Sequence, residues 1–314
     1  MSVPASTNTP TIAHKRARGP VRPFPGWAPW IFIAPFLIIF GTFILWPLLK
    51  SLLLSLEYSY GPAHTVFVGL RNYRLILGDP LFWAAVRNTC IFAAGSVFLQ
   101  LPLAFGLAML LNRRGLRWRA VYRLIFFAPY LVGLVFASLI FSFIFEKRTG
   151  LINRTLHNLL PAWNPEFPWL QEYAVITLIL VALWLYVGLN MVYFLAALQH
   201  VSSDLLDAAS IDGAGPWQRF RQVILPEILP VGSFVVMLSI IGSLQLFELP
   251  WVLLTNPTQP VPDERGITIV VYLYQTGFIT SDLGYASAVG WLLAVVLMGI
   301  AVAQRRIVGA RENA

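Results

Sequence analysis

Six long runs of apolar residues limit what this chain can fold into more than any other feature of its sequence. A helix needs about 20 mostly apolar residues to cross the hydrocarbon core of a bilayer. Because backbone groups in lipid must be paired within the protein, the predicted fold is all-α, a polytopic membrane protein with a bundle of six transmembrane helices. The predicted spans are residues 27–49, 91–111, 124–145, 174–198, 231–254 and 285–303.

The composition excludes most other classes of protein. Of the 314 residues, 58% are hydrophobic and 11% are charged, whereas soluble domains are about 45–50% apolar and about 25% charged. The apolar runs do not alternate with polar residues, as the strands of a membrane β-barrel would. The net charge of +8 does not indicate a nucleic-acid partner, because the basic residues form short clusters between the apolar runs.

Neither a disulfide nor a metal site is predicted. Cys90 is the single cysteine, so no intrachain disulfide can form. The four histidines are too far apart along the chain for a helical metal motif, and no cofactor is expected. They are His14, His64, His157 and His200.

The first apolar run has one alternative interpretation, a cleavable signal peptide, because basic residues precede it. The run is longer than the apolar core of such peptides, and no small-x-small cleavage site follows it. We therefore expect a retained helix.

The distribution of lysine and arginine predicts the orientation, because cytoplasmic segments are enriched in them. With the N-terminus inside, the inside segments hold 14 of these residues and the outside segments hold 7. The densest cluster lies in a short loop, from Arg113 to Arg123. Both termini are thus expected in the cytoplasm, as tails of residues 1–26 and 305–314.

The inside loop of residues 203–226 has the signals of a helix-turn-helix. Ser203 is the expected N-cap, and Gly213 suits a left-handed C-terminal cap. Pro216 fits the first position of a second helix, which Pro226 is expected to end. Taken alone, this pattern also fits an amphipathic pair resting on lipid.

The spacing within this loop is more specific. Asp207-Ala208-Ala209 is followed after three residues by Gly213, and nine residues later by Val223-Ile224-Leu225-Pro226. This resembles the cytoplasmic Glu-Ala-Ala loop of binding-protein-dependent ABC transporter permeases, with Asp207 in place of the glutamate and Val223 in place of an isoleucine. The resemblance implies contact with an ATPase subunit at Asp207, Ala208, Ala209, Gly213, Phe220 and Pro226.

Other segments are similar to the sugar-permease branch of that family, the maltose and glycerol-phosphate type. They are residues 68–73 (VGLRNY), 79–83 (DPLFW), 87–89 (RNT) and 284–288 (GYASA). The resemblance implies a permease domain over residues 27–304, in a bacterial or archaeal cytoplasmic membrane. It also implies partners: a second homologous permease, two ATPase subunits, an extracytoplasmic solute-binding protein and the membrane lipid.

The chain has no phosphate-binding loop of its own. Such a loop ends in Gly-Lys-Ser/Thr, and none of the three lysines (Lys15, Lys50, Lys147) follows a glycine. The protein is therefore predicted not to be an enzyme, and the energy for transport is expected from a separate subunit.

Polar residues inside the predicted spans are candidates for a solute pathway. Glu248 is expected near the outer end of the fifth span, and Asn190 with Tyr193 in the fourth. The structural alternatives are that Glu248 reaches the interface and that Asn190 bonds between helices. The candidate pathway residues are Asn190, Tyr193, Gln245, Phe247, Glu248 and Trp251.

Two other function classes are weighed against the permease. An ion-coupled secondary transporter should show inverted repeats and intramembrane carboxylates, but only Glu248 is a candidate and no repeat is evident. An integral-membrane enzyme ranks last, because no span holds paired carboxylates or a nucleophile with its base.

Overall fold

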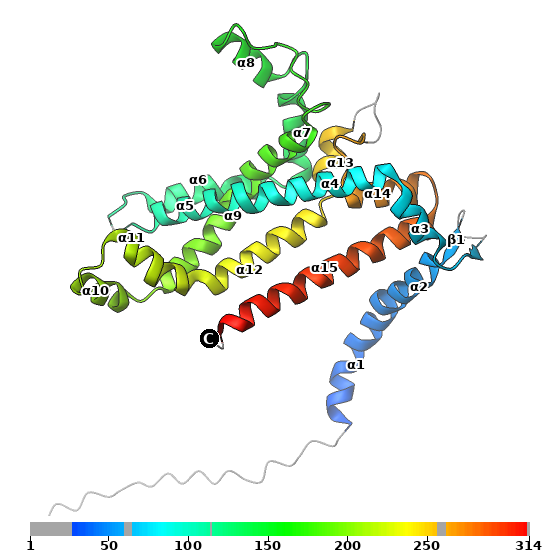
Figure 1. Cartoon of the computed structure of the whole chain (residues 1–314), viewed down its shortest axis with the longest axis horizontal. Coiled ribbons are helices and arrows are strands. Elements are labelled where there is room, and N and C mark those ends of the chain that lie inside the picture. The colour runs from blue at the N-terminus through cyan, green and yellow to red at the C-terminus, as the bar shows by residue number, and fades with distance from the viewer. Residues whose placement is uncertain (1–26, 60–64, 114, 256–261, 313–314) are drawn as a thin grey trace, which may run out of the picture. The chain divides into compact units, whose positions relative to one another are not determined.

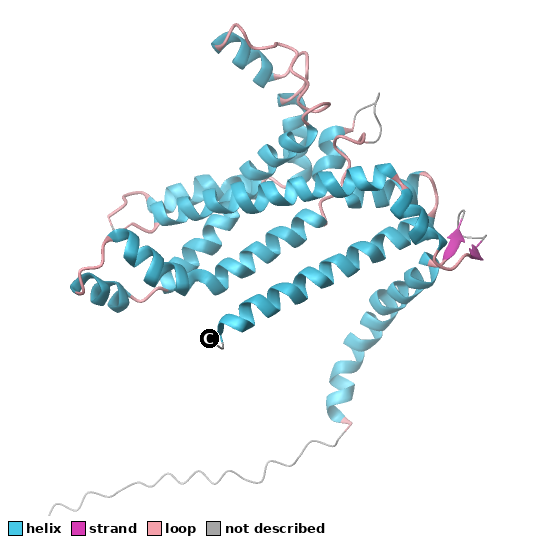
Figure 2. Ribbon diagram, in the orientation of Figure 1, coloured by secondary structure: helices cyan, strands magenta, loops and turns pink. Residues whose placement is uncertain are grey.

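The computed structural model describes residues 27–59, 65–113, 115–255 and 262–312, and these are predominantly helical (Figure 1, Figure 2). The only strands in these ranges form a short antiparallel hairpin, in which Tyr58 pairs with Val66. The predicted class, an all-α polytopic membrane protein, is confirmed. The predicted N-terminal tail lies outside the described residues. The two strands are β1 (Glu57–Ser59) and β2 (Thr65–Phe67).

The chain divides into two compact units, residues 1–50 and residues 51–314. The first unit holds most of the first span, which is longer than the predicted 27–49. Its apolar stretch from Trp30 to Leu54 is long enough to cross a bilayer. This helix consists of α1 (Ala28–Phe40), η1 (Gly41–Leu45) and α2 (Trp46–Ser55).

Five described helices in all have the length and apolar character of a membrane span, and a bent helix pair makes up to six. The predicted number of spans agrees with the larger count. Three of the helices contain a predicted span and extend beyond it. They are Pro80–Leu111 (predicted 91–111), Ala174–His200 (174–198) and Leu283–Arg306 (285–303).

The predicted third span, residues 124–145, is not one straight helix. It consists of α6 (Arg119–Leu131) and α7 (Leu134–Ile144), which meet at 89°. Gly133 lies between them with φ at 82°. A right-handed helix cannot continue through that conformation. The hydropathy of the sequence does not indicate this break.

The predicted fifth span, residues 231–254, is wrong at both ends. The helix runs without interruption from Pro216 to Leu244, so Pro226 does not end a helix as predicted. The chain then breaks, and Glu248 begins a separate short helix. The elements are α11 (Pro216–Arg219), η3 (Phe220–Ile224), α12 (Leu225–Leu244) and α13 (Glu248–Leu254).

A wider turn explains how these helices accommodate proline. A proline inside a helix lacks an N–H, and its ring clashes with the carbonyl four residues earlier. Three of the π-turns described end two residues before a proline, and a π-turn relieves this conflict without breaking the helix. The prolines are Pro47 after η1, Pro102 after η2 (Ser96–Gln100) and Pro226 after η3.

A carboxylate fixes the start of the second span. The Asp79 side chain accepts the Leu81 backbone N–H at 2.8 Å and so caps the helix that begins at Pro80. The same carboxylate accepts the Tyr272 hydroxyl, and the Tyr272 and Tyr285 hydroxyls lie 2.7 Å apart. Asp79 therefore ties α4 (Pro80–Gly95) to α14 (Ile269–Tyr274) and α15 (Leu283–Glu312).

The last helix continues to Glu312, so most of the segment predicted as a C-terminal tail, residues 305–314, is helical. The remaining helices are short or complete a span. They are α3 (Arg71–Gly78), α5 (Leu101–Leu111), α8 (Leu151–Leu159), α10 (Ser203–Ile211) and η4 (Gln275–Ile279).

Helix α9 (Ala174–His200) lies at the centre of the second unit. Of its 27 residues, 15 are buried, and it packs against α4, α5, α6, α7, α12 and α13. It approaches α6 most closely at Gly188. A Cβ built on Gly188 would lie only 1.7 Å from the Phe126 carbonyl oxygen. Only glycine allows the two backbones to come this near.

We expect Gly188→Ala to lower the stability of the folded protein. The added methyl group meets backbone atoms rather than a movable side chain, and overpacking of this kind costs about 1–3 kcal/mol or more. The measurement is membrane abundance together with thermal unfolding in detergent. Gly106→Ala is the matched control, because a Cβ there has no neighbour within 4 Å. Equal stability of the two variants would contradict the close approach.

Candidate functional site

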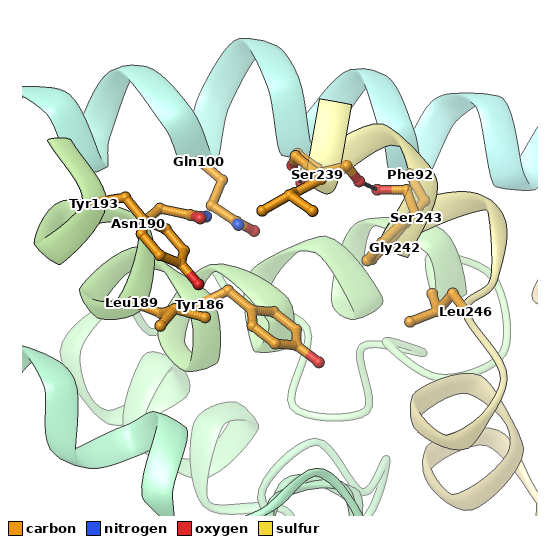
Figure 3. Close-up of a pocket in the computed structure, with 12 residues that line it drawn as sticks. Phe92, Gln100, Tyr186, Leu189, Asn190, Tyr193, Ser239, Gly242, Ser243 and Leu246 are labelled. Atoms are coloured by element: carbon orange, nitrogen blue, oxygen red, sulfur yellow. Dashed lines mark hydrogen bonds between the residues drawn. The ribbon is translucent and has the colours of Figure 1, made fainter. Parts of the chain in front are cut away.

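A cavity of about 210 Å³ lies between α4, η2, α9 and α12 (Figure 3). Three different spans supply its walls, so it lies within the helical bundle rather than on a loop. It is the first candidate site. Its lining residues are Phe92, Ser96, Gln100, Tyr186, Leu189, Asn190, Tyr193, Leu238, Ser239, Gly242, Ser243 and Leu246.

Two carboxamides are the most informative groups in this cavity. Gln100 is 4% exposed and Asn190 is 9% exposed, yet neither side chain forms a hydrogen bond with another described residue. Figure 3 shows them pointing toward one another from η2 and α9. Buried polar groups are nearly always paired. The polar atoms of these two carboxamides are open to the cavity, where a bound solute or water can pair with them.

Serines join two walls of the cavity. The Ser96 and Ser239 hydroxyls lie 2.6 Å apart, which links η2 to α12. Ser243 donates to the Ser239 carbonyl at 2.7 Å within its own helix. The bond between Ser96 and Ser239 joins the two walls, whereas the bond of Ser243 stays within α12.

The lining is mainly apolar, and its polar groups carry no charge. No described residue that lines the cavity is a carboxylate, a lysine, an arginine or a histidine. Carboxamides both donate and accept, and hydroxyl groups do so as well. Phe92, Tyr186 and Tyr193 add aromatic surface. The cavity can thus hydrogen-bond an uncharged solute that is rich in hydroxyl groups and pack against its apolar faces.

The predicted pathway residues fall into two groups. Asn190 and Tyr193 line the cavity. Gln245, Phe247, Glu248 and Trp251, which follow the end of α12 at Leu244, do not line it. Gln245 and Glu248 are exposed.

Phe247 and Trp251 belong instead to an aromatic cluster with Tyr274. The ring centroids of Phe247 and Trp251 are 5.8 Å apart, and each lies about 5 Å from that of Tyr274, at 5.0 and 4.9 Å. These contacts pack α13 against α14. A role in the pathway remains a prediction for the four residues after the break.

Several cavity residues were not singled out from the sequence. Ser96 and Gln100 are polar residues in the predicted run 91–111, and Ser239 and Ser243 are polar residues in the run 231–254. The signal that could have found them is their position inside apolar runs. Serine also bonds to its own helix, however, so that signal does not separate a lining residue from a packed one.

The second candidate site is the predicted helix-turn-helix, here α10 followed by the helix from Pro216. Ser202 rather than Ser203 is the N-cap, and its hydroxyl accepts the Asp204 N–H at 3.2 Å. Gly213 has φ at 77°, the left-handed cap that was predicted. Pro216 begins the second helix, also as predicted.

The two helices of this loop are held together by polar contacts. Arg219 donates from Nη1 to the Ser210 hydroxyl at 2.9 Å, and Gln218 accepts the Gly215 N–H at 2.8 Å. The Ala214 N–H reaches back to the Ala209 carbonyl at 2.9 Å. The turn is therefore a defined structure that can move as a unit.

The predicted coupling residues divide between the surface and the interior. Asp207, Ala208, Gly213 and Pro226 are exposed, and Ala209 is half-buried. Phe220 faces the bundle, where its ring centroid lies 6.1 Å from that of Phe105 in α5. The exposed acid and small residues leave α10 accessible to a partner, while Phe220 anchors the second helix.

Comparison with known proteins agrees with this arrangement. Residues 100–311 match the family described as binding-protein-dependent transport system inner membrane component. The chain is 34% identical to the arabinooligosaccharides transport system permease protein AraP of Bacillus subtilis (strain 168), over 90% of this chain and 88% of the relative. It is 33% identical to the lactose transport system permease protein LacF of Rhizobium radiobacter, over 90% and 94%.

A third relative and a solved structure extend the comparison. The sn-glycerol-3-phosphate transport system permease protein UgpA of Yersinia pestis is 31% identical, over 90% of this chain and 94% of the relative. A crystal structure of a bacterial alginate ABC transporter, in complex with an alginate pentasaccharide-bound periplasmic protein, superposes with a TM-score of 0.75. Sequence identity there is 21%, over 90% of this chain and 93% of that one, so this likeness concerns the fold.

The helical bundle, the family match and the named relatives together identify the chain as a membrane permease. The chain belongs to the family of inner-membrane components of binding-protein-dependent transport systems, and it is a permease subunit of an ABC importer. The ATPase of such a system is a separate subunit, as predicted. This assignment replaces the alternatives of an ion-coupled transporter and a membrane enzyme.

We expect Gly213→Val to reduce solute uptake without removing the protein from the membrane. A β-branched residue resists the positive φ at this turn, although the space beside Gly213 is open. Gly213→Asn is the control, because asparagine tolerates the left-handed conformation. Uptake by the complete transporter and membrane abundance are measured together. Normal uptake by a normally abundant valine variant would refute the role of this turn.

Proposed function

We propose that this permease subunit translocates an uncharged sugar, most simply a short oligosaccharide, through the cavity between α4, η2, α9 and α12. The observation that carries this proposal is the pair of buried, unpartnered carboxamides in a cavity without charged lining residues. A sugar presents hydroxyl groups that donate and accept, which is the chemistry these carboxamides lack within the protein.

The relatives support the same class of solute. AraP and LacF are named for arabinooligosaccharides and lactose, which carry no charge, whereas UgpA is named for a phosphate ester. An anionic solute would have to leave water without a cationic partner in this part of the pathway, which is costly. The uncharged lining therefore favours the first two solutes as models.

The proposal includes a defined set of partners. A solute-binding protein outside the membrane delivers the sugar, a second homologous permease completes the pathway, and two ATPase subunits drive the change between outward-facing and inward-facing states. The loop α10–α11 docks to an ATPase subunit. Its exposed Asp207 accepts a charge-assisted hydrogen bond from a basic residue of that subunit.

The proposal also includes an orientation. The inner membrane is the location that the family gives, and the excess of arginine and lysine on one side assigns that side to the cytoplasm. An even number of spans, with the bent pair counted as one, supports an arrangement with both termini on that side. The docking loop then lies on the same side as the ATPase subunits.

We expect Gln100→Leu and Asn190→Leu each to weaken uptake of a neutral oligosaccharide. Loss of one hydrogen bond costs about 0.5–1.5 kcal/mol, which is roughly a two- to tenfold change. Folding should not suffer, because neither carboxamide has a partner within the described protein. The measurement is uptake of radiolabelled lactose or arabinooligosaccharide against its concentration, at equal membrane abundance.

Asn158→Leu is the matched control, because Asn158 is an exposed carboxamide on α8, away from the cavity lining. Gln100→Glu tests the charge argument, since a carboxylate in the cavity should impair transport more than leucine does. If both leucine variants transport like the wild type, the cavity is not the pathway.

We expect Asp207→Lys to weaken ATPase co-purification and to abolish uptake. Truncating one partner of a buried interfacial charge pair costs about 2–5 kcal/mol, and reversing its charge adds repulsion. Asp207→Glu restores the residue typical of the family and should retain activity. Co-purification of the ATPase subunit and solute uptake are the two measurements.

Asp204→Ala is the control within the same helix. Asp204 lies in the first turn of α10, where an acid stabilises the helix dipole by only about 0.3–1 kcal/mol. If Asp207→Lys keeps both ATPase binding and transport, the loop does not dock the ATPase, and the interpretation as an amphipathic surface pair replaces it.

A further inference from the structure

The segment that joins α5 to α6 is rich in cationic side chains, and none of them lines the cavity described above. We call the side chains of Arg113, Arg117, Arg119 and Arg123 the arginine cluster. Arg113 and Arg117 are exposed, while Arg119 and Arg123 are half-buried. The cluster belongs neither to the helix-turn-helix of residues 203–226 nor to the cavity lining.

No acid balances the cluster along the chain. Between Asp79 and Glu146 the sequence contains no aspartate or glutamate. Arg119 donates to the Arg113 carbonyl at 2.6 Å and so helps to hold the connecting segment in place. The Nε of Arg123 is buried and has no acceptor among the described residues. Because this Nε is closed off from solvent, the donors open to an anionic partner from outside the chain are those of the exposed Arg113 and Arg117.

The connection that carries the cluster is short. The span from Pro80 ends at Leu111, and the next apolar helix begins at Arg119. A connection of seven residues between two spans cannot carry its side chains far from the bilayer surface. In our inference, Arg113 and Arg117 lie at the depth of the lipid headgroups, where phosphate is the most abundant anion.

Apolar side chains are interleaved with the arginines. Trp118 is 73% exposed with φ at 65°, and Tyr122 is 41% exposed. Tryptophan and tyrosine favour the membrane interface, where one end of the ring is apolar and the other is wet. A surface of this mixed kind suits the boundary between headgroups and acyl chains better than an acidic protein surface, which would leave the exposed indole against polar groups.

We propose that the arginine cluster binds the headgroup phosphates of anionic phospholipids and that Trp118 and Tyr122 seat the same lipids at the interface. Guanidinium groups bind phosphate through paired N–H donors, and anionic lipid surfaces attract basic segments next to a span. The cluster gives the permease a preference for anionic over zwitterionic lipid. This inference requires only that the chain spans the bilayer and does not rest on the proposed solute.

The test measures which lipids the full chain retains. The purified protein is exchanged into mixed micelles with equal amounts of phosphatidylglycerol and phosphatidylcholine, and bound lipids are counted by native mass spectrometry. Arg113→Gln combined with Arg117→Gln should lower the phosphatidylglycerol preference at least tenfold, because both side chains are exposed and make no contact that folding needs. Arg123→Gln should lower it by a smaller factor. In the wild type, added sodium chloride should also lower it.

The control removes the same charge elsewhere. Arg71→Gln with Arg74→Gln changes two exposed arginines of α3, just before the opposite end of the same span, and should leave the preference almost unchanged. An unchanged preference in the Arg113/Arg117 variant would overturn the proposal, as would an equal fall in the control pair. Loss of ATPase co-purification with unaltered lipid preference would also overturn it and would assign the cluster to a protein partner.

Discussion

The packing of α9 against its neighbours is the interaction on which the rest of the second unit depends. This helix contacts six others, and at Gly188 the α6 backbone comes close enough to exclude any side chain. The close contact fixes how α9 is rotated about its axis. That rotation directs Asn190 and Tyr193 toward the cavity while Leu185 and Met191 enter the core. Without a hydrophobic drive between helices in lipid, such close packing is what holds a bundle together.

Proline residues accompany the π-turns that shape the same bundle. The π-turn before Pro102 contains both Ser96 and Gln100, so two of the cavity's polar residues lie on the widened turn itself. A π-turn shifts the side chains that follow it relative to those of a regular α-helix. The proline that would have broken a straight helix is therefore associated with the segment that lines the cavity. Pro226 and η3 repeat the arrangement where the coupling loop joins α12.

Hydropathy predicted the class of fold because lipid allows few alternatives to a helix. Local residue signals predicted the helix-turn-helix of residues 203–226, and Gly213 has the left-handed backbone that its residue type suggested. The break at Gly133 and the break after Leu244 were missed, because each depends on backbone conformation inside a run that is apolar throughout. Gln100 was missed for a related reason. Gln100 is informative because its side chain has no hydrogen-bond partner among the described residues. That can be seen only once three separate spans are packed around the cavity.

The coupling loop and the cavity are connected through aromatic packing rather than through the backbone alone. The Phe220 ring lies beside Phe105, and Phe105 lies 5.4 Å from Phe194, measured between ring centroids. Phe194 follows Tyr193 directly in α9, and Phe105 lies little more than one helical turn beyond Gln100. Close-packed interiors switch between arrangements rather than deforming continuously. A partner that displaces the loop would therefore have to repack Phe105 and Phe194, and the two helices that carry the cavity's carboxamides would respond together.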